Sequence, residues 1–187
     1  MAPSSAPSNV DLTYFLALPW CEALLSAPGT SLLPTPSRIP KASTEDSMFA
    51  VTLRTGDTIP YMLSFSSMRP APVVGGGTGG NSSAAAAVDG SAAPAPAETI
   101  EQVSTLFAIG EGINGYPATA HGGVIAALFD EAMGVSMMRL RASASNPKCP
   151  AGGTDIVTAS LKVDFVRRLG TPGEVVVRVW VAERRGR

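Results

Sequence analysis

The chain has few of the residues that bind metals or carry out redox chemistry in proteins. Its 187 residues include one histidine and two cysteines. Cys21 and Cys149 lie far apart in the sequence and form no metal-ligand or redox motif, so we interpret both as free thiols of a reducing compartment. We therefore expect no metal site and no cofactor.

Charge is also scarce. Charged residues make up 16% of the chain and the formal net charge is −1, which gives no support for nucleic acid as a partner. The apolar run Phe15–Trp20 is too short to cross a membrane, and no basic residue precedes it as in a secretory signal. These absences predict a cytoplasmic protein that contacts neither nucleic acid nor membrane.

What the chain does contain is apolar residues, at 45% of the total, enough for one core but not for two full domains. We expect residues 1–47 to form an N-terminal helix and linker, and residues 48–187 to form the main domain. Residues 69–97 are almost entirely Gly, Ala, Ser and Pro and predict a disordered insertion. Its glycines do not form a phosphate loop, because no Gly-Lys-Ser or Gly-Lys-Thr follows them.

Hydrophobic periodicity predicts a mixture of helices and strands. An amphipathic helix is expected over Asp11–Leu25, interrupted near Pro19, and a longer one from Gly122 to about Leu140. On a helical wheel the longer helix presents Val124, Leu128 and Val135 on one face. The expected strands are Met48–Arg54, Ile59–Ser66, Thr99–Gly110, Ile156–Val166 and Glu174–Glu183.

The start of the longer helix suggests a reaction. His121 precedes two glycines, and the free N–H groups that open a helix favour an anion or a developing oxyanion. Asp130, further along the same helix, is a candidate base. Nine residues at a rise of about 1.5 Å separate it from His121 by roughly 13 Å, too far for both to reach one carbonyl. The simplest geometry places an antiparallel helix of a second subunit alongside, so that two copies share the site.

A family resemblance is carried by four segments: Gly112–Pro117, His121–Gly123, Asp130–Gly134 and Thr158–Gly170. They resemble acyl-CoA thioesterases of the hotdog-fold superfamily, of the 4-hydroxybenzoyl-CoA and phenylacetate-pathway type, and are most similar to the fungal branch.

The resemblance implies an α+β fold, in which an antiparallel sheet wraps around one long central helix, in a homodimer or tetramer. It implies hydrolysis of an acyl or polyketide thioester of coenzyme A or a carrier protein, in secondary-metabolite biosynthesis. It also assigns roles. Asp130 matches the catalytic carboxylate, which acts as general base or nucleophile. Gly122 matches the backbone donor that polarises the thioester carbonyl, and His121 matches a supporting histidine. Substrate-binding positions are Asn114, Gly123 and Thr158, whose hydroxyl would orient the water.

Other interpretations remain open. The glycine pair is also typical of a tight turn, and His121 could be a structural histidine. Asp130 and Glu131 could form an ordinary exposed face of the helix. The same fold also serves non-catalytic acyl-binding or interaction proteins, and hydratases or dehydratases. Relatives continue after the position of Arg187 into two further strands, so we expect the last two strands of the sheet to be missing, unless a partner strand completes it.

Overall fold

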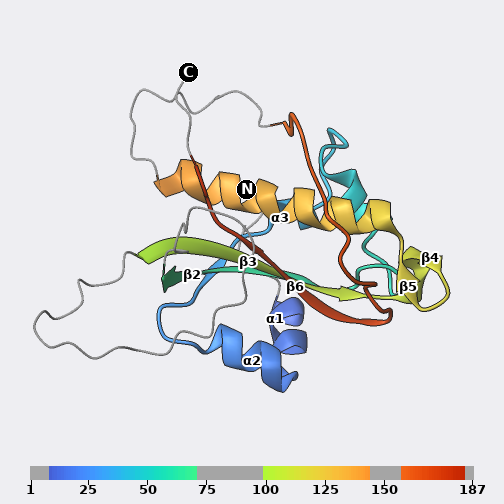
Figure 1. Ribbon diagram of the computed structural model, residues 1–187, viewed down its shortest axis with the longest axis horizontal. Helices are drawn as coiled ribbons and strands as arrows, with labels where there is room; N and C mark the ends of the chain where they lie inside the picture. Colours follow the sequence, from blue (N-terminus) through green and yellow to red (C-terminus); the bar gives the residue numbers. More distant parts are fainter. Residues whose placement is uncertain (1–8, 71–98, 144–156, 184–187) are drawn as a thin grey trace, which may run out of the picture.

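The computed structural model describes residues 9–70, 99–143 and 157–183. One long helix lies on one face of an antiparallel sheet, and two short helices lie on the other (Figure 1). None of the helices in these ranges combines the length and apolarity that crossing a membrane requires. The expected α+β architecture, with an antiparallel sheet against a long central helix, is confirmed.

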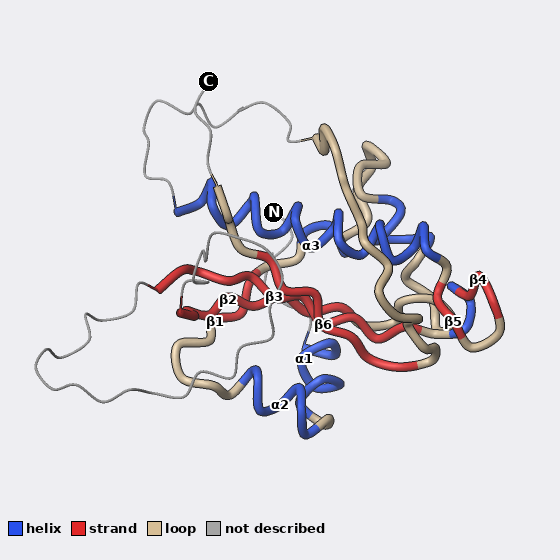
Figure 2. Tube along the Cα trace, viewed as in Figure 1, coloured by secondary structure: helices blue, strands red, loops and turns tan. Residues whose placement is uncertain are grey.

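The main sheet has four antiparallel strands in the described residues, in the order β1-β2-β3-β6. A separate hairpin of β4 and β5 lies at the start of the long helix (Figure 2). The strands are β1 (Ser31–Leu33), β2 (Met62–Pro70), β3 (Thr99–Ile109), β4 (Asn114–Tyr116), β5 (Thr119–Ala120) and β6 (Gly173–Val179).

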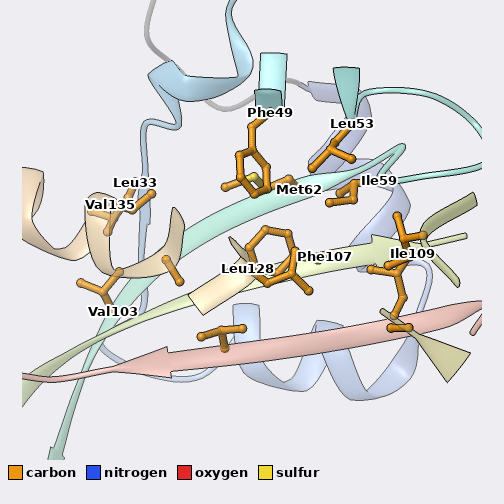
Figure 3. Close-up of a cluster of buried hydrophobic side chains, with 14 residues drawn as sticks. Leu33, Phe49, Leu53, Ile59, Met62, Val103, Phe107, Ile109, Leu128 and Val135 are labelled. Carbon is orange, nitrogen blue, oxygen red and sulfur yellow. The ribbon is translucent and has the colours of Figure 1, made fainter. Parts of the chain in front are cut away.

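The long helix α3 (Gly122–Ser143) packs its apolar face on one side of the sheet. Because successive strand residues point to opposite faces, Met62 of β2 and Phe107 of β3 reach the same cluster as Leu128 and Val135 of α3 (Figure 3). The predicted helix and its predicted buried face are both confirmed.

Helices α1 (Asn9–Leu16) and α2 (Pro19–Leu25) cover the opposite face of the sheet. Phe15 and Cys21 are fully buried there against alternate residues of β2 and β3. The Tyr14 hydroxyl donates to Glu174 at 2.6 Å, and burial is the main cause that raises the pKa of Tyr14 to about 12. The predicted break at Pro19 is confirmed, and these helices lie on the side of the sheet away from α3.

Two predicted strands are wrong. The segment predicted as a strand over Met48–Arg54 is the short helix η2 (Met48–Thr52). Its buried residues are Phe49, Ala50 and Leu53, a helical rather than an alternating spacing. The described part of the strand predicted over Ile156–Val166 is extended but carries no ladder, because no neighbouring strand in the described residues offers it backbone hydrogen bonds.

Other boundaries shift. The strand predicted over Ile59–Ser66 begins later, at Met62, after a proline that has no N–H to donate. It extends through Pro70, while most of the predicted insertion lies outside the described residues. The strand predicted over Glu174–Glu183 ends at Val179. The N-terminal segment that we expected to be a linker contributes the edge strand β1 and the short 3-10 helix η1 (Pro36–Arg38).

A buried arginine fastens η1 to the rest of the domain. Arg38 is 5% exposed, and its guanidinium donates to the carbonyl oxygens of Phe49, Ile59 and Pro60 at 2.9 to 3.0 Å. Burial lowers the pKa of Arg38 to about 10, so the side chain remains charged near neutral pH. One side chain therefore ties η1 to η2 and to the approach of β2.

We expect Arg38→Ala to lower the free energy of unfolding by at least about 3 kcal/mol, because each buried acceptor left without a partner costs about 1–3 kcal/mol. Urea denaturation measures this difference. Arg178→Ala, at an exposed position of β6, is the control and should change stability by less than about 0.5 kcal/mol. Equal stability of the two variants would contradict this role for Arg38.

Candidate active site at the start of the long helix

His121 is the residue that caps the N-terminus of α3. Its carbonyl oxygen accepts the N–H groups of Val124 at 2.9 Å and Ile125 at 3.0 Å, and its ring Nδ1 accepts the N–H of Gly123 at 3.0 Å. A ring nitrogen that accepts a hydrogen bond carries no proton, so in the neutral imidazole the hydrogen is on Nε2. The side chain therefore satisfies one of the free donors that open the helix.

The β4–β5 hairpin holds His121 in place. The His121 N–H donates to the Ile113 carbonyl at 2.9 Å. A Cβ atom added at Gly115 would lie 2.8 Å from His121 Cδ2 and 2.9 Å from its Cα. Only glycine lets the hairpin come this close to the histidine. Gly115 thus allows the hairpin to pack against His121 and support the start of α3.

Gly122 keeps the N–H that is open to a ligand. Within the described ranges, the Gly122 N–H donates to no protein acceptor, whereas the Gly123 N–H donates to the His121 Nδ1. The ring of Phe165 lies beside Gly122, 3.5 Å from where its Cβ would be. Of the two backbone donors suggested by the sequence, the structure leaves Gly122 as the candidate for polarising a carbonyl.

Asp130 lies two turns further along α3 and is exposed. The Thr158 hydroxyl donates to its Oδ1 at 2.5 Å. Thr158 belongs to the extended segment 157–169, which follows the helix in the chain, and the sequence separates the two residues by 28 positions. The structure therefore brings together two of the predicted site residues, the carboxylate and the hydroxyl.

Gly122 and Asp130 do not meet within one chain. Eight residues separate them, and at a rise of about 1.5 Å per residue this is about 12 Å along the axis. A straight helix cannot shorten this distance. The donor and the carboxylate can act on one substrate carbonyl only if a second copy supplies one of them.

An apolar cavity of about 230 Å³ lies between α3, the extended segment and β6. Phe129, the neighbour of Asp130, belongs to its wall, as does Phe165, the neighbour of Gly122 in space. The other lining residues are Ile125, Leu128, Val163, Asp164, Val166, Arg167, Leu169, Val175, Val176 and Val177. The space suits an apolar group whose polar end reaches the surface of α3.

Asn114, expected to bind substrate, has an internal partner. Its Oδ1 accepts a hydrogen bond from the Thr171 hydroxyl, which is buried in the turn before β6. The same turn is joined to the hairpin by the Thr171 N–H, which donates to the Ala118 carbonyl at 3.3 Å. In this arrangement Asn114 holds the hairpin that supports His121.

Sequence reasoning missed the environment of Glu131. Its carboxylate accepts a hydrogen bond from the Ser37 hydroxyl of η1, and it is half-buried while the adjacent Asp130 is exposed. Burial is the main cause that raises the pKa of Glu131, against the opposing effects of Ser37 and Arg38. Adjacency to Asp130 is a sequence signal, but nothing in the sequence points to Ser37, 94 positions away.

We expect His121→Ala to lower the free energy of unfolding by about 0.5–2 kcal/mol, the usual cost of losing an N-cap side chain. His121→Asn should recover most of that loss, because asparagine places an acceptor where Nδ1 lies and is a favoured N-cap residue. Urea denaturation of both variants measures the difference. An equal loss in the two would show that contacts of the ring, rather than the cap, stabilise the helix start.

A comparison with known protein families finds a match in the part of the chain that contains this site. Residues 118–187, which contain α3, Asp130, Thr158 and β6, match the family model described as the thioesterase superfamily. No curated protein and no solved structure matches the chain. Residues 118–187 are thus similar to the thioesterase superfamily, and the antiparallel sheet packed against one long helix is consistent with the hotdog fold of that superfamily.

Proposed function

We propose that this protein hydrolyses acyl thioesters of coenzyme A or of a carrier protein. The match of residues 118–187 to the superfamily supports a thioester hydrolase type of function in general. The observation that carries the proposal is the hydrogen bond from the Thr158 hydroxyl to the Asp130 carboxylate, on a helix that also lines an apolar cavity. A carboxylate held by one oxygen on an open helix face keeps its other oxygen for water.

The reaction needs few groups. In the proposed mechanism Asp130 takes a proton from a water molecule through the oxygen that Thr158 does not hold, and the water oxygen attacks the thioester carbon. The Gly122 N–H stabilises the negative charge that develops on the carbonyl oxygen, and one such donor is typically worth about 10²- to 10³-fold in rate. The C–S bond then breaks, and the thiolate leaves and takes up a proton. In the alternative form of this mechanism, Asp130 itself acts as the nucleophile.

The proposed site is shared between two antiparallel copies of α3. The 12 Å estimated along the axis between Gly122 and Asp130 requires a second copy. Large apolar side chains are exposed on α3 and on the extended segment: Phe129 is 38% exposed, Met137 42% and Phe165 59%. A second copy that covered them would gain apolar burial and would also exclude water from the carboxylate.

The cavity indicates the class of acyl group. At about 230 Å³ it falls below the range of about 300–1,000 Å³ usual for drug-sized ligands, which favours a short or single-ring acyl group over a long chain. Arg167 at its wall suits the charged end of the thiol carrier. The proposed place in secondary metabolism rests on the sequence resemblance, and the proposed cytoplasmic location rests on the composition of the chain.

We expect the purified protein to release free thiol from a panel of short-chain and aromatic acyl-CoA thioesters, and Asp130→Asn to lose this activity. The amide keeps the shape of the carboxylate and removes its basicity. Size-exclusion chromatography should give the same elution volume for both proteins. Binding of the thioesters without turnover by the parent protein would favour the alternative, a non-catalytic acyl-binding protein of the same fold.

Gly122→Pro tests the backbone donor directly, because proline removes the N–H and is well tolerated at the first position of a helix. We expect kcat to fall about 10²- to 10³-fold. Gly122→Ala is the matched control: it keeps the N–H, and its Cβ would make an ordinary 3.5 Å contact with Phe165. Equal activity of the proline and alanine variants would exclude the Gly122 N–H from the mechanism.

The same variants test whether two copies share the site. Random mixing of Asp130→Asn and Gly122→Pro chains makes half of the dimers mixed, and each mixed dimer contains one site with both native groups. We therefore expect the mixture to recover about a quarter of the parental activity, from two nearly inactive proteins. A mixture as inactive as its components would place both groups of a working site in one chain.

A further inference from the structure

Two carboxylates stand next to each other on α3 with opposite surroundings. Successive residues of a helix point about 100° apart. Asp130 faces outward to Thr158, whereas Glu131 turns toward η1 and accepts the Ser37 hydroxyl. Any rotation of α3 about its axis that moves Asp130 therefore also changes the distance between Glu131 and Ser37.

The support on the other side of this hydrogen bond is rigid. Ser37 is the middle residue of η1, and it is 8% exposed. The next residue, Arg38, is anchored by its hydrogen bonds to three carbonyl oxygens on two other segments. Backbone hydrogen bonds from Arg38 to Thr35 and from Ile39 to Pro36 close the turn. Ser37 is thus a fixed point against which α3 is held.

The remaining contacts of α3 restrain its rotation less sharply near Asp130. Leu128, Ala132 and Val135 pack in the core, and such apolar contacts have little directional preference. The ion pair of Arg139 with Glu101, at 2.8 Å, lies about 13 Å further along the axis. In the described residues, the hydrogen bond between Ser37 and Glu131 is therefore a directional contact that holds α3 beside Asp130, on the side of the helix away from Thr158.

We propose that Glu131, held by Ser37, is a positioning residue that sets the rotation of α3 and so keeps Asp130 in register with Thr158. Glu131 touches no substrate in this scheme. Its value to the reaction lies in geometry, since an error of about 1 Å in the position of a catalytic group can cost about 10² in rate. The inference rests on the proposed hydrolase function for its kinetic consequence but not for its structural one.

The structural consequence is tested by disulfide trapping between positions 130 and 158. Asp130→Cys and Thr158→Cys are combined with Cys149→Ser, while Cys21 is fully buried and stays. The rate of disulfide formation then reports how well the two positions face each other. We expect Glu131→Leu and Ser37→Ala each to slow it at least several-fold. Glu131→Gln should form the disulfide at the parental rate, because its amide oxygen still accepts from Ser37.

Glu101→Gln is the control, because it weakens the ion pair of α3 at Arg139 without touching Glu131 or Ser37. It should leave the trapping rate unchanged. Unchanged trapping in both Glu131→Leu and Ser37→Ala would overturn the proposal, as would an equal slowing in Glu101→Gln. Ser37→Ala removes one hydroxyl group, so it provides the answer if the larger change at Glu131 prevents folding.

In the native background, without the cysteine substitutions, the same four variants give the kinetic test. We expect Glu131→Leu to lower kcat by about 10²-fold with KM little changed, and Glu131→Gln to retain the parental kcat within a few-fold. A loss in Glu131→Gln as large as in Glu131→Leu would overturn the positioning role and assign the charge of Glu131 a direct one. If the parent protein hydrolyses no thioester, the proposed function fails and the trapping rates alone decide this inference.

Discussion

The packing of α3 on the sheet is the interaction on which the rest of the structure depends. Its buried face, with Leu128, Ala132 and Val135, sets the depth at which the helix lies. Its N-terminus is then fixed by the β4–β5 hairpin through His121, and its middle by η1 through Glu131. Because one rigid helix carries both the open N–H of Gly122 and the carboxylate of Asp130, their separation cannot adjust to a substrate. The fold thereby makes pairing of two chains a condition of the proposed chemistry.

The sequence was a good guide wherever a periodic signal coincided with local structure. The helix beginning at Gly122, the strand over Thr99–Ile109 and the break at Pro19 follow from apolar spacing and from the properties of glycine and proline. The sequence resemblance also placed Asp130 and Thr158 in one site, and the structure brings them into hydrogen-bond contact. These features depend on interactions within a segment or on a pattern shared by a family.

The predictions that were wrong depended on contacts between distant segments. Residues 48–54 contain apolar residues that fit a short strand, but burial of Phe49, Ala50 and Leu53 and the hydrogen bond from Arg38 to Phe49 select a helical turn. The segment 157–166 has strand-like composition, yet a ladder requires a neighbour, which composition does not report. Ser37 could not be found for the same reason, because its role comes from a partner 94 residues away.

The two short N-terminal helices have a consequence for assembly. With Phe15 and Cys21 buried against it, the outer face of the sheet is already a protein interior and not a surface. Sheets of two such chains cannot stack back to back without first displacing α1 and α2 and breaking the contact of Tyr14 with Glu174. A pair of such chains could form a tetramer only through other surfaces, such as strand edges, loops or the outer sides of the helices, so α1 and α2 prevent direct stacking of the sheets.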